Sequence, residues 1–167
     1  TVEDNILPTA NCQGITVYLD DTGSVSIMAE DIADGPSDAC GVASLTLDQY
    51  DFSCADVGDK TVVLTAKDNN GNEATCDATV TVEDNILPTA NCQGITVYLD
   101  DTGSVSIMAE DIADGPSDAC GVASLTLDQY DFSCADVGDK TVVLTAKDNN
   151  GNEATCDATV TVEDNIL

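Results

Sequence analysis

The chain has 167 residues, of which 32 are Asp or Glu, four are Lys and none is Arg or His, so its net charge is −28. Such a chain has no basic patch to meet phosphate, which excludes nucleic acid as a partner and argues against binding to anionic membranes. It has no apolar run long enough to span a bilayer, and its patterned hydrophobic fraction of 43% argues against disorder.

The sequence is an exact tandem repeat. Residues 1–80 and 81–160 are identical, and residues 161–167 begin a third copy. We therefore expect two small domains in tandem and interpret the chain as a window taken from a longer array. The predicted division is the end of a preceding repeat and its linker at 1–7, a first domain at 8–84, a linker at 85–87, a second domain at 88–164, and the start of the next linker at 165–167.

Within one repeat the apolar residues alternate with polar ones, as at Ile15, Val17 and Leu19, which is the pattern of half-buried antiparallel strands. Turns rich in Asp, Asn and Gly separate the strands, and no stretch has helical periodicity. The pattern predicts an all-β fold, with tandem immunoglobulin-like β-sandwich domains in a linear array, joined stiffly by a linker of about four residues. In chain order the predicted strands are 11–19, 23–31, 42–49, 50–55, 60–67 and 74–83.

Each repeat has four cysteines, an even number that predicts two disulfides and an oxidising compartment. Zinc is the alternative, but there is no CxxC pair and the chain has no His. The first and last strands of an immunoglobulin-like sandwich can run parallel and adjacent, which favours one of the three possible pairings. The predicted disulfides are Cys12–Cys76 and Cys40–Cys54 in the first repeat, and Cys92–Cys156 and Cys120–Cys134 in the second.

Strand alternation brings three acidic segments to one pole of the first domain: the linker, the loop 30–41 and the loop 68–72. Carboxylates gathered in this way repel one another by about 1–4 kcal/mol per close pair. Hard oxygen ligands, with no His or thiolate available, select Ca²⁺ over transition metals, so we predict a calcium site. The candidate ligands are Glu3, Asp4, Asn5, Asp31, Asp34, Asp38, Asp68, Asn70 and Asn72.

The alternative interpretation is that Asp, Asn and Gly are ordinary turn residues and that the acids only solvate a surface. We prefer this interpretation for four acids that lie away from the converging segments, namely Asp20, Asp21, Asp48 and Asp59. For the three converging segments we prefer calcium, because separate parts of the chain agree.

Three strings, P-x-A-x-C at 8–12, D-A-C-G at 38–41 and A-K-D-N-N-G-N-E-A-T-C at 66–76, resemble the hyalin-repeat class of immunoglobulin-like domains. This class occurs in tandem in large secreted and surface proteins of bacteria. The linker EDN followed by a Pro is also similar to the calcium-binding linkers of cadherin repeats, although the full D-x-N-D-N string is absent. The resemblance implies an extracellular or cell-surface role in adhesion or scaffolding, with calcium rigidifying the junctions. For the second repeat it implies the ligands Glu83, Asp84, Asn85, Asp111, Asp114, Asp118, Asp148, Asn150 and Asn152.

These observations favour a structural segment of a calcium-stabilised extracellular filament or adhesin stalk. Its expected partners are identical repeats joined head to tail, with lateral association between filaments as a further expectation. The alternative function is a multivalent glycan- or protein-binding module, but the chain has no Trp or Arg and each repeat has only Tyr18 and Tyr50 or their equivalents. An enzyme is not expected, because His is absent and no Ser lies in a nucleophile-elbow string.

Overall fold

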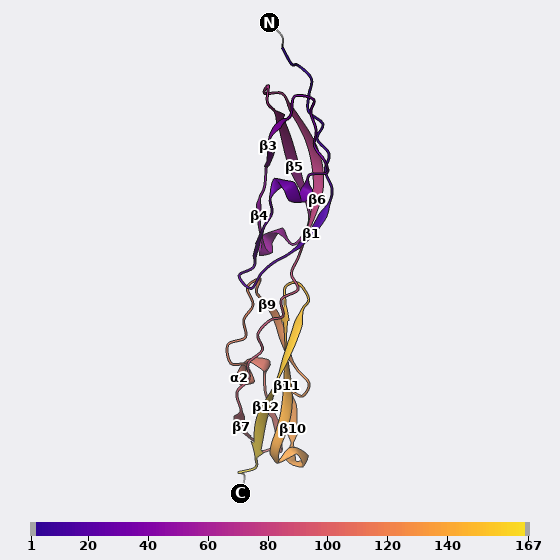
Figure 1. The fold of residues 1–167 in the computed structure, drawn as a ribbon. Helices are drawn as coiled ribbons and strands as arrows, with labels where there is room; N and C mark the ends of the chain where they lie inside the picture. The colour runs from indigo at the N-terminus through magenta and orange to yellow at the C-terminus, as the bar shows by residue number, and fades with distance from the viewer. Residues whose placement is uncertain (1–2, 166–167) are drawn as a thin grey trace. The chain divides into compact units, whose positions relative to one another are not determined.

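A computed structural model of the chain describes residues 3–165. Parts of the predicted end segments 1–7 and 165–167, namely residues 1–2 and 166–167, lie outside the described residues. The chain divides into two compact units between Asn85 and Ile86. Because their sequences are identical, the two units contain the same series of elements (Figure 1).

Each unit has six strands, one short α-helix and one turn of 3₁₀ helix (η) within the described residues. The first unit contains β1 (Ile15–Tyr18), β2 (Ser24–Ser26), α1 (Ala29–Ile32), β3 (Val42–Leu47), β4 (Asp51–Ser53), η1 (Cys54–Asp56), β5 (Gly58–Asp68) and β6 (Glu73–Glu83). The second contains β7 (Ile95–Tyr98), β8 (Ser104–Ser106), α2 (Ala109–Ile112), β9 (Val122–Leu127), β10 (Asp131–Ser133), η2 (Cys134–Asp136), β11 (Gly138–Asp148) and β12 (Glu153–Glu163). Within residues 3–165, no helix has the length and apolar character needed to cross a membrane.

The strands of each unit form a four-stranded and a two-stranded sheet. In the first unit the larger sheet has the order β1-β6-β5-β3, and β2 pairs with β4 in the smaller one. The second unit repeats this as β7-β12-β11-β9 and β10-β8. The first strand runs parallel to the last, with Ile15 opposite Val80, whereas the other pairs are antiparallel. The prediction of an all-β chain with two immunoglobulin-like sandwich domains is confirmed.

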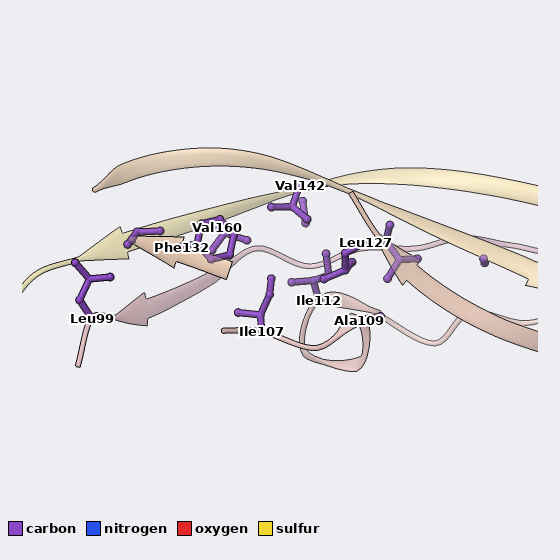
Figure 2. Packing of buried hydrophobic residues seen from close by; sticks show 12 residues of the cluster. Leu99, Ile107, Ala109, Ile112, Leu127, Phe132, Val142 and Val160 are labelled. Carbon is purple, nitrogen blue, oxygen red and sulfur yellow. The ribbon is translucent and has the colours of Figure 1, made fainter. Parts of the chain in front are cut away.

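The core follows the alternation of the two long central strands. Val62, Leu64 and Ala66 of β5 are fully buried, and Val80 and Val82 of β6 lie beside them on the same face. In the second unit, Ile107 and Ile112 point toward the strands that carry Val142 and Val160 (Figure 2). The apolar residues that alternate in the sequence are therefore those that the two sheets bury between them.

The predicted strand 23–31 is wrong in its second half, because Ala29–Ile32 forms the helix α1. Asp31 Oδ2 accepts a hydrogen bond from the Met28 N–H at 2.7 Å, and the Ala33 N–H donates to the Ala29 carbonyl at 3.0 Å. Ala29 and Ile32 are buried, so one helical turn fills the core where we expected an extended segment. Four residues are too few to reveal helical periodicity in the sequence.

The disulfide prediction is half right. Cys12 bonds to Cys76 with a Cα–Cα distance of 5.8 Å, and Cys92 bonds to Cys156 at 5.9 Å, as expected from the parallel first and last strands. The predicted Cys40–Cys54 and Cys120–Cys134 disulfides are wrong, because Cys40 and Cys134 are free cysteines.

The physical reason is the length of β5. Gly41, next to Cys40, accepts a hydrogen bond from the Asn69 N–H just beyond the end of β5. Cys54 lies in η1, just before β5 begins at Gly58. The 11 residues of β5 separate these two ends by about 33 Å, whereas a disulfide requires Cα atoms about 4.4–6.8 Å apart.

Candidate metal centre

In the first unit, Asp4, Asp38 and Cys40 come together at one end of the sandwich. A carboxylate oxygen of each Asp and the Sγ atom of Cys40 all lie within 4.8 Å of one another. Asp4 belongs to the segment that precedes β1, while Asp38 and Cys40 belong to the loop between α1 and β3. We call these three residues, together with Asp68 and Asn72 of the β5–β6 hairpin, the acidic pole.

Hydrogen bonds between side chains and backbone groups hold the acidic pole together. The Cys40 N–H donates to Asp38 Oδ1 at 2.7 Å, and Asn69 Nδ2 donates to the Cys40 carbonyl at 2.7 Å. Asn72 Nδ2 donates to the Asp4 carbonyl at 3.1 Å. The linker, the long loop and the hairpin therefore meet at one end, as the strand alternation predicted.

Gly41 is required for this close approach. Its φ of +93° lies in a region that L side chains rarely adopt, and a Cβ there would lie 2.8 Å from Asn69 Nδ2. Any side chain at this position would press on the amide that holds the Cys40 carbonyl.

Asp68 organises the hairpin of the acidic pole. Only 1% of Asp68 is exposed. Its Oδ1 accepts from the N–H groups of Asn70 and Asn72 at 2.8 Å, and its Oδ2 accepts from Asn72 Nδ2 at 2.7 Å. Desolvation acts to raise the pKa of Asp68, but these hydrogen bonds outweigh it and hold the pKa below its ordinary value. Asp68 therefore stays ionised and adds its negative charge to the pole.

The negative charge around Cys40 raises the pKa of its thiol. Its pKa is raised, first by a hydrogen bond with the Asp4 carboxylate and by the charge of Asp4, and then by desolvation and the charges of Asp38 and Asp68. The thiol is therefore protonated at neutral pH and is not a thiolate ligand. What the cluster offers a metal is hard oxygen, with the carboxylates of Asp4 and Asp38 as the nearest pair.

Five predicted ligands of the first repeat lie outside this cluster, and one of them, Asn70, is an exposed residue that contributes only its backbone N–H to Asp68 Oδ1. Asp31 caps the N-terminus of α1, and the backbone N–H of Asp34 donates to the Asn11 carbonyl at 2.9 Å. The side chains of Glu3 and Asn5, on either side of Asp4, are exposed. The sequence indicated which segments meet at this end of the unit but did not distinguish a helix-capping Asp from a clustered one.

The loops of the second unit repeat the local geometry. The Cys120 N–H donates to Asp118 Oδ1 at 2.7 Å, and Asn149 Nδ2 donates to the Cys120 carbonyl at 2.6 Å. Asp148 Oδ1 accepts from the N–H groups of Asn150 and Asn152 at 2.8 Å.

The other ligands predicted for the second repeat make different contacts. Asp111 caps α2 as Asp31 caps α1, and the Asp114 N–H donates to the Asn91 carbonyl. Glu83 ends β6, where its carbonyl accepts from the Leu19 N–H at 2.9 Å, and Asp84 and Asn85 follow that strand.

Three of the four acids that we interpreted as turn residues, Asp20, Asp48 and Asp59, accept hydrogen bonds within the first unit. Asp20 Oδ1 accepts from the Thr22 N–H and hydroxyl, at 2.8 and 2.6 Å. Asp48 Oδ1 accepts from the Val63 N–H at 2.9 Å. Sequence reasoning missed Cys40 as a neighbour of the carboxylates, although its position two residues after Asp38 was a usable signal.

Comparison with known proteins adds little to this description. No family model matches the chain, and no curated protein matches it. Among solved structures, the chain is similar to fibronectin(III)-like modules of Clostridium thermocellum CbhA, with 13% identity over 95% of each chain and a TM-score of 0.36.

The chain is also similar to domains EC1-2 of human mucin-like protocadherin, with 11% identity over 94% of this chain and 98% of that one, at a TM-score of 0.45. A third similar structure is Drosophila N-cadherin EC1-4, with 12% identity over 95% of this chain and 50% of that one, at a TM-score of 0.47. The sandwich assignment therefore rests on the strand topology.

Proposed function

We propose that the chain is a structural segment of an extracellular array of β-sandwich repeats, stabilised by Ca²⁺ bound at the acidic pole. The observation that carries the proposal is the approach of the Asp4 and Asp38 carboxylates to within 4.8 Å. These two groups come from the linker and from a domain loop, so a cation that binds both ties the linker to the body of its unit.

The charge of the pole supports a cation. Two carboxylates this close repel each other by roughly 1–4 kcal/mol at surface-like dielectrics. With 32 acidic residues against four Lys in the chain, few side-chain cations are available to offset the repulsion. The Lys67 ammonium binds Glu73 at 2.9 Å, and the Lys60 ammonium lies 3.6 Å from Asp56, at the far end of β5.

The donor set fits Ca²⁺ better than Mg²⁺ or a transition metal. Calcium accepts six to eight oxygen ligands in flexible geometry, so water and carbonyl groups can complete a shell that begins with two carboxylates. With so few charged ligands, we expect a dissociation constant of about 0.1–1 mM, the range typical of extracellular modules. Such a site is occupied where calcium is abundant, outside cells, which agrees with the oxidising compartment that the disulfides indicate.

The exact repeat supports a mechanical rather than a recognition role. Every repeat presents the same surface, and recognition usually depends on aromatic or Arg anchors. Of the two Tyr in the first unit, Tyr50 is engaged internally, since its hydroxyl accepts a hydrogen bond from the Leu47 N–H at 2.9 Å. Tyr18 is 55% exposed, but the chain has no Trp or Arg that could form a binding surface together with it. A filament or stalk segment is therefore preferred over a glycan- or protein-binding module.

The proposal is tested by thermal unfolding in EDTA, in Mg²⁺ and in Ca²⁺. With a dissociation constant of about 1 mM, Ca²⁺ at about 10 mM adds about 1.4 kcal/mol of stability per site, which raises Tm by roughly 5–10 °C. The variant D38N, made together with D118N, keeps an oxygen to accept the Cys40 or Cys120 N–H but loses the charge. Its Tm is expected to be insensitive to Ca²⁺ and slightly higher than wild type in EDTA.

The matched control is D77N with D157N, which changes charge equally at exposed positions in the middle of β6 and β12. This control should keep the full Ca²⁺ response. An equal response in all three proteins, or none in the wild type, contradicts the proposal, and an equal response to Mg²⁺ contradicts the choice of calcium.

A further inference from the structure

Each repeat contains one Asn that is followed directly by Gly, namely Asn70–Gly71 in the first and Asn150–Gly151 in the second. Asn is a chemically labile residue, because the backbone nitrogen of the next residue can attack its side-chain amide. A Gly in that next position has no Cβ to hinder the attack. The other Asn residues precede Ile, Cys, Asn or Glu, so Asn70 and Asn150 are the ones at which this reaction is sterically easiest.

The structure places Asn70 and Gly71 at an open hairpin tip. Both residues are exposed, and they lie between the end of β5 and the start of β6. The φ of Gly71 is +96°, and a Cβ built there would meet nothing within 4 Å among the described residues. The tip is therefore uncrowded at Gly71, and packing does not prevent the closure of a ring there.

Hydrogen bonding opposes the attack in the closed hairpin. The attacking Gly nitrogen must lose its proton, and in the second unit the Gly151 N–H donates this proton to Asp148 Oδ1 in a hydrogen bond of 2.6 Å. In the first unit the Gly71 N–H donates to Asp68 as well, to its carboxylate and to its carbonyl at 3.4 Å. A carboxylate beside the nitrogen also disfavours the amide anion, because the two negative charges repel each other.

The same carboxylate fixes the rest of the tip. Asp148 Oδ1 accepts from the N–H groups of Asn150 and Asn152 at 2.8 Å, and Asp148 Oδ2 accepts from Asn152 Nδ2 at 2.7 Å. Only 1% of Asp148 is exposed, so water does not compete for these bonds. Ring closure rotates the peptide between Asn150 and Gly151, and this rotation breaks the charged hydrogen bond of the Gly151 N–H.

We propose that Asn70 and Asn150 are sites of spontaneous succinimide formation, and that the buried carboxylates of Asp68 and Asp148 suppress this reaction while the hairpin is closed. The exposed Asn–Gly pair supplies the reactive groups, and the carboxylate holds the attacking nitrogen in its protonated form. Modification therefore follows local opening of the hairpin between the two long strands of a unit.

The reaction needs water and no other reagent. The deprotonated Gly71 nitrogen attacks Asn70 Cγ, the bond from Cγ to the side-chain nitrogen breaks, and that nitrogen takes up the proton and leaves as ammonia. The resulting succinimide then adds one water molecule. Opening at Cγ gives Asp with an unchanged backbone, whereas opening at the backbone carbonyl carbon gives isoaspartate, in which the chain runs through Cγ. Neither step is an oxidation or a reduction.

Either product changes the acidic pole. A new carboxylate stands at position 70, two residues from Asp68, and repels the acids already there. Isoaspartate also adds a carbon to the backbone, which moves the N–H groups of Gly71 and Asn72 out of register with the Asp68 carboxylate. Because Asn72 Nδ2 donates to the Asp4 carbonyl at 3.1 Å, the change extends to the contact between the hairpin and the linker.

The test measures the conversion of Asn70 and Asn150 in the full chain, incubated in EDTA at neutral pH and physiological temperature. Peptide mapping by mass spectrometry locates each conversion, and chromatography separates the Asp product from isoaspartate. Conversion should be about tenfold or more slower in the folded wild type than in the same chain reduced and unfolded in guanidinium chloride. Asn69 and Asn72 are internal controls, and in the unfolded chain they should convert more slowly than Asn70.

The role of the carboxylate is tested with D68N/D148N, which keeps the side-chain shape but removes the charge. In the folded variant, conversion of Asn70 and Asn150 should be about tenfold faster than in the folded wild type. Far-UV circular dichroism checks that the variant is folded. If it is not, N72A/N152A takes its place, because it removes the amide that holds the second oxygen of each carboxylate, and it should accelerate the conversion in the same direction.

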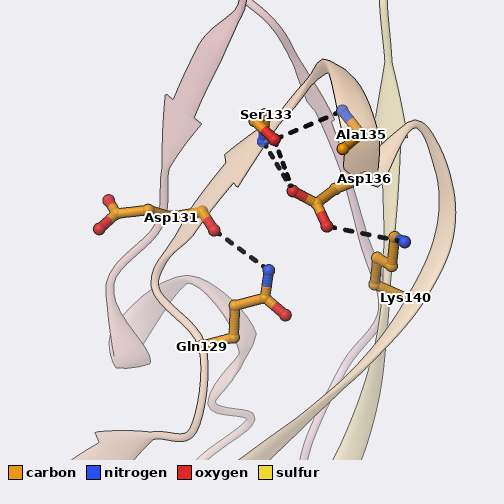
Figure 3. Close-up of polar contacts among 6 residues, drawn as sticks. All are labelled: Gln129, Asp131, Ser133, Ala135, Asp136 and Lys140. Carbon is orange, nitrogen blue, oxygen red and sulfur yellow. Dashed lines mark hydrogen bonds and ion pairs between the residues drawn. The ribbon is translucent and has the colours of Figure 1, made fainter.

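The matched control is D56N/D136N, which removes a carboxylate that accepts a backbone N–H in a different turn. In the second unit Asp136 Oδ2 accepts from the Ser133 N–H at 2.9 Å (Figure 3). This control should convert Asn70 and Asn150 at the wild-type rate, because the hairpins are unchanged.

Three results overturn the proposal. They are equal rates in the folded and the unfolded wild type, no acceleration in the folded hairpin variant, and an acceleration in the control as large as in that variant. All incubations contain EDTA, so these results are distinguishable from failure of the calcium proposal.

Discussion

Removal of the disulfide between the first and last strands is expected to destabilise each unit more than any other single change. The variant replaces Cys12, Cys76, Cys92 and Cys156 by Ala. β1 pairs with β6 over only four positions, from Ile15–Val80 to Tyr18–Glu83. Before it, the segment is attached by isolated bridges, such as Cys12 with Ala33. The covalent bond therefore carries much of the attachment of the N-terminal segment.

The magnitude follows from the chain that the bond closes. A sequence separation of 64 corresponds to about 4 kcal/mol of lost unfolded-state entropy at 25 °C. A repeat of this size is expected to have a total stability of about 4–12 kcal/mol. The variant is therefore expected to be marginally folded, with a urea midpoint far below that of the wild type.

The assay is urea unfolding followed by far-UV circular dichroism, with all proteins in the same redox state and in EDTA. The matched control is C40A, which removes an exposed free cysteine from the same unit and should change the unfolding free energy by at most about 0.5 kcal/mol. If the quadruple variant fails to fold, the double variant C12A/C76A gives the comparison for the first unit alone. A loss below about 1 kcal/mol, indistinguishable from that of C40A, would refute the reasoning.

Two further predictions concern the turns. Hydrogen bonds from the Thr22 hydroxyl and from the Ser24 and Thr22 N–H groups hold the pKa of Asp20 below its ordinary value, and Thr102, Ser104 and Gly103 do the same for Asp100. Since the folded pKa is the lower one, the stabilisation is present above about pH 4 and is lost as pH falls through the folded pKa. D20A/D100A should therefore have a lower urea midpoint than wild type at pH 7, and the two midpoints should converge in acid. A difference in midpoint that stays constant with pH would contradict the assignment. The neighbouring D21A/D101A is the control. G41A should lose about 0.5–1.5 kcal/mol more than G35A, because both positions have positive φ but only a Cβ at Gly41 meets the Asn69 amide that holds the Cys40 carbonyl. Equal losses in urea unfolding would contradict that contact.

The sequence predicts the long strands well because their burial repeats over many residues. In β5, Val62, Leu64 and Ala66 alternate with more exposed residues, and the strand spans Gly58–Asp68 where we expected 60–67. The short elements are different. α1 has four residues, and its helical state depends on the Asp31 cap and on core space for Ile32, neither of which has a periodic signal.

The acidic pole was predictable as a meeting of segments but not as a set of ligands. Alternation of strand direction fixes which loops share an end, so the convergence of Asp4, Asp38 and Asp68 could be expected. It does not fix which acid caps a helix, as Asp31 does. The error over Cys40 and Cys54 has a related cause: a count of four cysteines suggests two internal pairs, although β5 separates these two by its full length.

The central claim, a calcium ion at the acidic pole, is tested most directly by a crystal structure of the chain grown with Ca²⁺ at about 10 mM, with anomalous scattering to identify the ion. The account predicts an ion bound by the carboxylates of Asp4 and Asp38 at oxygen distances of about 2.3–2.6 Å. A pole without an ion at that concentration, with Asp38 still bonded only to the Cys40 N–H, would contradict it.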